Sequence, residues 1–150
     1  GAAITDILSM DSDENGILHL VGFNSQAPNP TTTVGQTSEY TAISEDFELP
    51  IGINIWGVFP HMHVLGTSYE MVSENECLVA SDRYDFDNQL TYMFDSPILL
   101  EQGTRFSLSC TWDNSATNPN LIINPPVDIG YGERTDEEMC YVFTLASLAR

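Results

Sequence analysis

Residues 102–115, QGTRFSLSCTWDNS, contain a strand-like run, Arg105–Trp112, between two turn-forming segments. Gln102-Gly103-Thr104 precedes this run and Asp113-Asn114-Ser115 follows it, and Gly, Asn, Asp and Ser are typical turn residues. The same arrangement continues in both directions along the chain. Further strand-like runs are Ile4–Met10, Ile17–Phe23, Glu39–Ile43, Ile51–Phe59, His61–Leu65, Tyr69–Val72, Cys77–Ala80, Thr91–Phe94 and Cys140–Leu145.

Turn signals also separate these other runs. They are Asn15-Gly16, Leu49-Pro50-Ile51-Gly52, Ser96-Pro97 and Asn124-Pro125-Pro126. No segment has an amphipathic helical period over three turns. Many short strands with regularly spaced turns favour a sandwich or a barrel. We therefore predict an all-β sandwich.

The length and charge of the chain limit its organisation and its partners. A chain of 150 residues without repeats or a linker predicts one domain, residues 1–150. With 22 acidic residues, four arginines and no lysine, the formal net charge is -18. Such an acidic chain cannot neutralise a run of phosphates, so nucleic acid and anionic membranes are excluded as partners. No run approaches the about 18–20 apolar residues of a membrane span, so no membrane insertion is expected.

Two histidines lie two positions apart in Pro60-His61-Met62-His63. On an extended strand, residues two apart point to the same face, so His61 and His63 can present two imidazoles to one metal ion. Pro60 places the start of this strand at a sheet edge or a bulge, where a site is open to solvent. The alternative is a pair of ordinary surface histidines. His19 is the only other histidine, so a three-histidine zinc site is not expected.

A second feature is the dipeptide Met139-Cys140. A thioether is a soft ligand that selects copper, so two imidazoles and Met139 would form a copper site, although a Met is more commonly core filler. The chain has three cysteines, so at most one intramolecular bridge can form and one thiol is left over.

These motifs occur in an order that resembles a known family. His-x-His-x-x-Gly at 61–66, followed about 70 residues later by Thr-x-x-Glu-Met-Cys at 135–140, resembles the second domain of the copper type II, ascorbate-dependent monooxygenases, the family of peptidylglycine alpha-hydroxylating monooxygenase and dopamine beta-monooxygenase. Tyr84–Gln89 is similar to the family's Tyr-x-Phe-x-x-Gln stretch, and 112–119 to its Asp-Asn-Ser segment, particularly in bacterial members. The resemblance covers about residues 45–150.

The resemblance implies an eight-stranded, antiparallel jelly-roll-type sandwich with one catalytic copper ion, the M site, on His61, His63 and Met139. It also implies a Cys110–Cys140 disulfide, which would hold Met139 in place and indicate a secreted or periplasmic protein. Cys77 would then be a free, buried thiol, with copper ligation as the alternative.

The sequence also departs from the family pattern. The family's first domain holds a second copper on three further histidines and supplies electrons, and this chain lacks those histidines. Members that amidate peptides have an arginine and a tyrosine where this chain has Phe59 and Phe143. An apolar or neutral small-molecule substrate would suit a pocket of Phe59, Phe143 and Trp56 better than a peptide carboxylate.

Two functions follow as hypotheses. In the first, the chain is the oxygen-activating half of a C–H hydroxylase that uses ascorbate and needs an N-terminal copper domain or a diffusible reductant. Alone it would be weakly active or inactive. In the second, the same scaffold is a non-catalytic copper-binding or recognition module.

Overall fold

Antiparallel strands in two sheets make up most of the described part of the chain, which in this computed structural model comprises residues 3–10, 18–24, 34–43, 47–74 and 76–149. In chain order the elements are β1 (Ala3–Met10), β2 (Leu18–Asn24), β3 (Tyr40–Ile43), β4 (Phe47–Glu48), β5 (Ile53–His61), β6 (Gly66–Ser73), β7 (Glu76–Ser81), the 3-10 helix η1 (Phe86–Asn88), β8 (Tyr92–Leu100), β9 (Arg105–Trp112) and β10 (Tyr141–Leu148).

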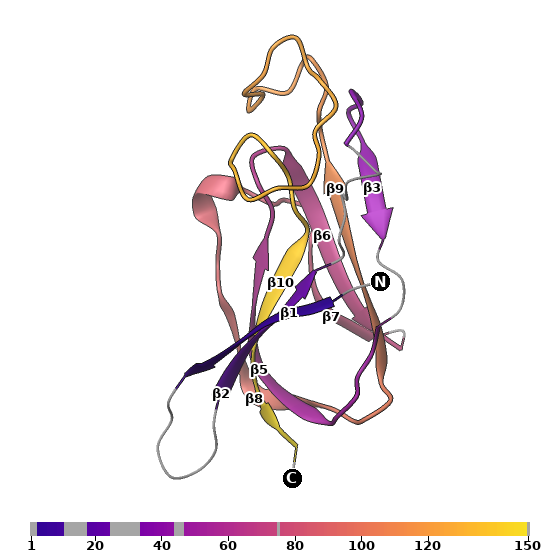
Figure 1. The fold of residues 1–150 in the computed structure, drawn as a ribbon, viewed down its shortest axis with the longest axis vertical. Coiled ribbons are helices and arrows are strands. Elements are labelled where there is room, and N and C mark those ends of the chain that lie inside the picture. Colours follow the sequence, from indigo (N-terminus) through magenta and orange to yellow (C-terminus); the bar gives the residue numbers. More distant parts are fainter. Residues whose placement is uncertain (1–2, 11–17, 25–33, 44–46, 75, 150) are drawn as a thin grey trace.

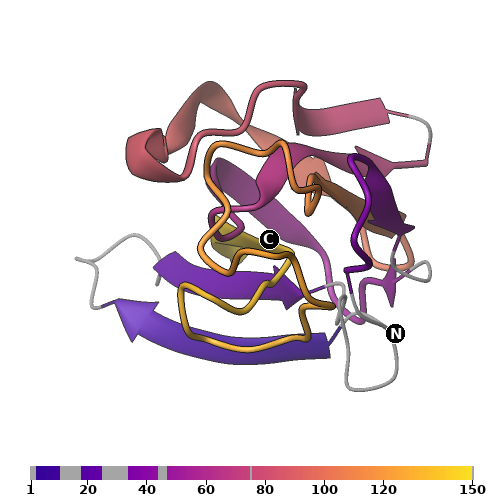
Figure 2. The same ribbon diagram turned by 90° about the horizontal axis from the view of Figure 1, so that it is seen from above.

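One sheet has the strand order β1-β2-β10-β5-β8. The other has the order β3-β9-β6-β7, with β4 also paired to β9. Figure 2 shows β1 and β2 on one side of the molecule and β7 on the opposite side. The predicted all-β sandwich is confirmed, and the described residues form ten strands where the resemblance implied eight.

The core lies between the sheets, and the alternation in β9 shows how the sequence builds it. Phe106, Leu108, Cys110 and Trp112 are at most 2% exposed, while the residues between them are partly exposed. The facing sheet contributes a matching buried set: Ile53, Ile55, Val58 and Val142. Each fully buried side chain of this size contributes about 1.5–3 kcal/mol to folding.

The predicted strand His61–Leu65 is not a strand. β5 continues through Pro60 to His61, and the chain then turns into β6, with the amide of Gly66 donating to the carbonyl of His63 at 3.1 Å. Gly66 is required at this turn because an added Cβ would lie 2.9 Å from the Cβ of Met62. Pro60 therefore lies at the end of β5 and not at the start of a strand. It is buried, and it lies beyond the last residue of β5 that pairs with β8.

Two further turn and strand predictions differ from the structure. Ser96-Pro97 lies inside β8 and not in a turn. β8 is at the edge of its sheet, where a proline without an N–H is tolerated. The two-residue strand β4 and the helix η1 were not predicted, because neither is long enough to show a periodic pattern. The predicted turn at Asn15-Gly16 lies outside the described residues, although β1 and β2 on either side of it do pair.

Candidate metal centre

Three segments that are distant in sequence meet at one end of the sandwich. They are the end of β5 with the following turn, the segment around η1, and the loop that leads into β10. Figure 1 shows η1 and the long segment between β9 and β10 at the same end of the molecule. Tyr141 pairs with His61 across β10 and β5, which brings Met139, two residues before Tyr141, next to the end of β5. A disulfide joins Cys140 to Cys110 of β9 and fixes this loop to the opposite sheet.

Gln89 determines which nitrogen of His61 is free. The Nε2 of Gln89 donates to the carbonyl of Phe86 at 2.9 Å, so its Oε1 faces the imidazole, 2.7 Å from Nδ1 of His61. An amide oxygen only accepts, so Nδ1 carries the proton and donates. The lone pair of His61 is therefore on Nε2, which is the atom left for a metal.

His63 is held in the same tautomer by the backbone. Its Nδ1 lies 2.8 Å from the carbonyl of Glu137, which can only accept, so Nδ1 is the donor and Nε2 carries the lone pair. Phe86 makes an edge contact with the ring at 6.1 Å, and His63 is 4% exposed. A metal-ligating histidine commonly donates its second N–H to a carbonyl or carboxylate in this way.

The relative position of the two rings fits a shared ion. Their centroids are 5.2 Å apart and their planes are nearly perpendicular, at 80°. A metal–nitrogen bond of about 2.0–2.1 Å places each ring centroid about 3.2 Å from the ion, and two such rings at a tetrahedral angle are about 5 Å apart. The observed separation agrees with that value.

Burial favours the neutral form of His61. It lowers the pKa of His61 below the ordinary 6.5; the hydrogen bond to Gln89 acts in the opposite direction, and the nearby His63 lowers the pKa further. A neutral imidazole is the form that binds metals.

Met139 lies at the same cavity as His61. It is 8% exposed, and with His61 it lines a hollow of about 500 Å³. The other lining residues are Phe59, Gln89, Tyr131, Glu133, Tyr141 and Phe143. In the described part of the chain, no group of three His, Cys, Asp or Glu residues forms a metal cluster, and the thioether of Met139 is the third candidate ligand beside the two imidazoles.

The buried carboxylate of Glu138 connects the histidine turn to the core. Its Oε1 accepts from the amide of Leu65 at 2.7 Å, and its Oε2 accepts from the amide of His63 and from the Nε1 of Trp112, both at 2.9 Å. Burial raises the pKa of Glu138 to about 7, although these hydrogen bonds act in the opposite direction. Glu138 is 0% exposed, so this carboxyl group lies wholly inside the sandwich.

Tyr84 fixes the backbone between the two histidines. Its hydroxyl donates to the carbonyl of Met62 at 2.6 Å and accepts from the amide of Met62 at 3.0 Å. Burial raises the pKa of Tyr84 to about 12. Tyr84, Phe86 and Gln89 are the three specified positions of the Tyr-x-Phe-x-x-Gln stretch, so that motif supplies three supports of the site. Sequence reasoning found the motif but not these roles.

A family model described as copper type II ascorbate-dependent monooxygenase, C-terminal domain, matches residues 13–145. The chain belongs to this family. A comparison with curated proteins finds no match. The match begins at residue 13, whereas the motif resemblance begins at about residue 45. The match therefore also includes β2 and β3.

In this member of the copper monooxygenase family, two of the three expected pocket residues lie at the site. Phe59 and Phe143 are paired across β5 and β10, with ring centroids 6.1 Å apart, and both line the hollow with His61. Trp56 does not line it. Trp56 is the extra residue of a bulge between Ile55 and Gly57, and its Nε1 donates to Ser147 at 3.1 Å.

Two other sequence expectations concern His19 and Cys77. The backbone of His19 in β2 pairs with Ala146 of β10, which is five residues from Tyr141, the partner of His61. At the rise per residue of a strand, these two positions of β10 are about 16 Å apart. Cys77 has a free thiol, but it is exposed on β7 and not buried as expected, because it lies on the outer side of a strand at the sheet edge.

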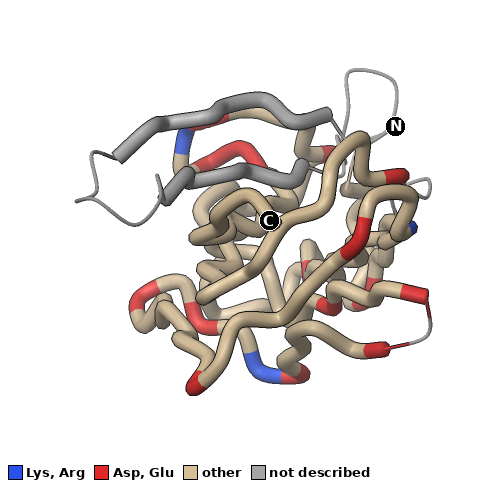
Figure 3. Tube along the Cα trace, turned by 90° about the horizontal axis from the view of Figure 1, so that it is seen from below, with Lys and Arg blue, Asp and Glu red and all other residues tan. Residues whose placement is uncertain are grey.

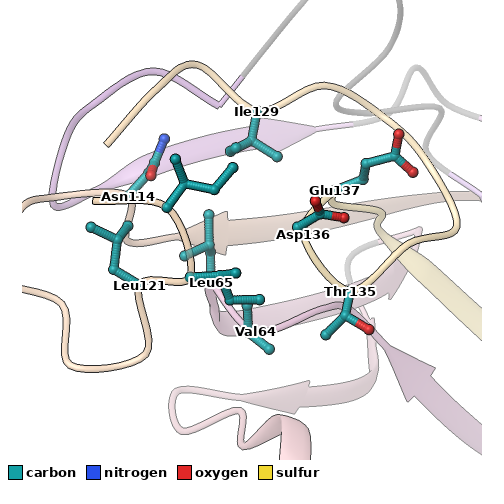
Figure 4. Close-up of a pocket in the computed structure, with 10 residues that line it drawn as sticks. Val64, Leu65, Asn114, Leu121, Ile129, Thr135, Asp136 and Glu137 are labelled. Atoms are coloured by element: carbon teal, nitrogen blue, oxygen red, sulfur yellow. The ribbon is translucent and has the colours of Figure 1, made fainter. Parts of the chain in front are cut away.

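A narrow crevice beside the site shows how the loops of this end pack. Figure 4 shows apolar side chains between Asn114 on one side and Asp136 and Glu137 on the other. The crevice measures about 10 Å³, which is about the space of one water molecule. The Nδ2 of Asn114 donates to the carbonyls of Val34, at 3.2 Å, and Val127, at 2.7 Å. The Asp-Asn-Ser segment thus connects the part of the chain before β3 with the long segment between β9 and β10, at the end of the sandwich that carries the histidines.

Proposed function

We propose that this chain binds one copper ion through His61, His63 and Met139 and serves in the hydroxylation of a C–H bond of a small molecule. The observation that carries the proposal is the tautomer of the two imidazoles: both Nδ1 atoms face acceptors, so both Nε2 atoms are available to bind a metal, and Met139 lines the same hollow as His61. Membership of the copper monooxygenase family supports it.

The donor set fits copper better than other metals. Imidazole nitrogens suit zinc, copper, iron and nickel, whereas a thioether selects copper, particularly Cu(I). When bound, copper would supply the activation of O₂ for hydroxylation. The chain's own residues orient the ligands: Gln89 holds His61, the carbonyl of Glu137 holds His63, and the disulfide at Cys140 limits the movement of Met139.

The hollow beside His61 is where a substrate would lie. Phe59 and Phe143 form an apolar wall of this hollow. None of the described residues that line the hollow is an arginine. An uncharged substrate therefore fits better than one anchored by a carboxylate, because a buried carboxylate without a cation is costly. Ascorbate, acting through a separate copper domain or directly, is the proposed electron source.

An anaerobic Cu(I) titration against a competing chelator tests the metal site. We expect one Cu(I) per chain, bound more tightly than Zn(II), and a large loss of affinity in His63→Ala and Met139→Ala. Met93→Leu is the matched control, because Met93 is a methionine on β8 that is 59% exposed. Equal affinity in the original chain and His63→Ala would refute the assignment.

A further inference from the structure

A second hollow of about 360 Å³ adjoins the one at the candidate metal centre. Its lining residues are Gly57, Val58, Phe59, Thr91, Met93, Phe143 and Leu145. Phe59 and Phe143 line both hollows. The two hollows therefore meet at this pair of rings, and together we call them the β5 groove, which follows β5 from His61 back to Gly57.

The second hollow lies where β5 and β8 pair irregularly. Gly57 of β5 pairs with Met93 of β8, and the preceding paired residue of β5, Ile55, pairs with Ile98. More residues of β8 than of β5 lie between these two pairs, so the pairing is irregular here. An added Cβ at Gly57 would lie 2.6 Å from the Sδ of Met93 and 2.9 Å from the carbonyl oxygen of Tyr92. The absent side chain lets Met93 lie close against β5 and form one wall of the groove.

The two ends of the β5 groove differ in chemistry. The end at His61 includes polar groups on Gln89, Tyr131 and Glu133. The end at Met93 is lined by apolar side chains and Thr91, and none of its described lining residues is ionisable. A charged group would lose its hydration there without gaining a partner, whereas a hydrocarbon segment would gain about 0.8 kcal/mol per buried methylene.

We propose that the β5 groove binds an elongated, uncharged substrate, with an alkyl or aryl tail against Met93 and Leu145 and the reacting carbon beside His61. This inference rests on the proposed function. Each hollow has the size of small-molecule sites, about 300–1,000 Å³, and the two meet at Phe59 and Phe143, so a single small molecule that spans both is the occupant that we propose. The reaction would be R–H + O₂ + 2 e⁻ + 2 H⁺ → R–OH + H₂O, with ascorbate as the electron donor.

Binding of neutral 1-alkanols to the metal-free and the Cu(I)-loaded chain tests the groove by calorimetry or by nuclear magnetic resonance shifts. From 1-hexanol to 1-decanol we expect the affinity to rise about threefold to fourfold per methylene. Octanoate should bind at least tenfold more weakly than 1-octanol. Met93→Asp should weaken 1-decanol binding at least tenfold. Leu99→Asp, on the same strand and 54% exposed, is the matched control and should not.

The outcomes separate this inference from the proposed function. If copper binds as proposed but 1-decanol binds equally to Met93→Asp and the original chain, or binds to neither, the groove inference alone is overturned. It is also overturned if sedimentation shows a dimer that Met93→Asp dissociates, because the groove is then an interface between copies. If the alkanols bind as expected but no copper binds, the proposed function fails while the groove remains a ligand site.

Discussion

Gln89 shows how one side chain can determine which ring nitrogen of another is free. Its amide is oriented by the carbonyl of Phe86, and it leaves His61 only one tautomer. We predict that Gln89→Leu lowers the affinity for Cu(I) about 10–100-fold, because the ring of His61 can then rotate and exchange tautomers. The chelator titration measures it. Asn88→Ala, an exposed neighbour in η1, should bind as the original chain does, and an unchanged affinity in Gln89→Leu would contradict the prediction.

Glu138 has a structural role that requires two acceptor oxygens. Oε1 accepts one N–H and Oε2 accepts two. In Glu138→Gln the amide nitrogen must face at least one of these donors, which leaves a buried N–H without an acceptor. We predict that the free energy of unfolding falls by about 1–3 kcal/mol, measured by urea denaturation. Glu70→Gln, on an exposed position of β6, should change it little; equal losses in both variants would refute this role for Glu138.

At the scale of elements, the disulfide links β9 to the loop that leads into β10. It encloses a segment with a sequence separation of 30, and the chain-entropy model assigns such a bridge about 3.5 kcal/mol. We predict that the double variant Cys110→Ser, Cys140→Ser loses about this much stability and also binds Cu(I) more weakly, because Met139 is no longer held.

Thiol labelling checks the bridge independently. In the unreduced protein, an alkylating reagent should modify Cys77 alone, because its thiol is free and exposed. The double serine variant should give the same labelling pattern. Label on Cys110 or Cys140 of the unreduced original chain would disprove the bridge.

Most strands could be predicted from their residues, and the exceptions have physical causes. β9 has the predicted bounds because its alternating pattern lies between two turn segments. The segment after His61 resembles a strand, but close packing of Gly66 against Met62 and the hydrogen bonds to Tyr84 turn the chain there. Local sequence does not report such contacts.

The candidate site could be predicted only in part, for the same reason. His61, His63 and Met139 were indicated by ligand chemistry and by the resemblance to a family. The hydrogen bond from His61 to Gln89 spans 28 positions, and the one from Trp112 to Glu138 spans 26. Such contacts depend on the packing of η1, β9 and the loop before β10, which no spacing rule gives.

At the scale of the whole molecule, the net charge of -18 affects how an anionic reductant reaches the site. Figure 3 shows acidic residues spread along the trace, with few basic ones. No described helix has the length and apolar character needed to cross a bilayer.

Ascorbate is an anion at neutral pH, so repulsion slows its approach, and salt screens the repulsion. We predict that ascorbate reduces the Cu(II)-loaded chain faster as ionic strength rises, measured by stopped-flow. A neutral reductant should show little salt dependence; equal salt dependence for both would contradict this prediction.

The last prediction follows from the number of electrons. Hydroxylation takes two electrons from a reductant, whereas one copper ion delivers one. His19 of β2 pairs with Ala146 of β10, which is five residues from Tyr141, the partner of His61. A second copper centre at this end therefore cannot use His19 without rearrangement of the sheet. The Cu(I)-loaded chain with ascorbate and a neutral alkyl substrate should therefore give little alcohol and release hydrogen peroxide.

Addition of a separate copper protein that donates electrons should raise the ratio of alcohol formed to O₂ consumed toward one. Mass spectrometry of the product and an oxygen electrode measure this ratio. Many turnovers by the chain alone, with O₂ consumption equal to alcohol formed, would show that a single copper centre is sufficient and that the half-enzyme interpretation is wrong.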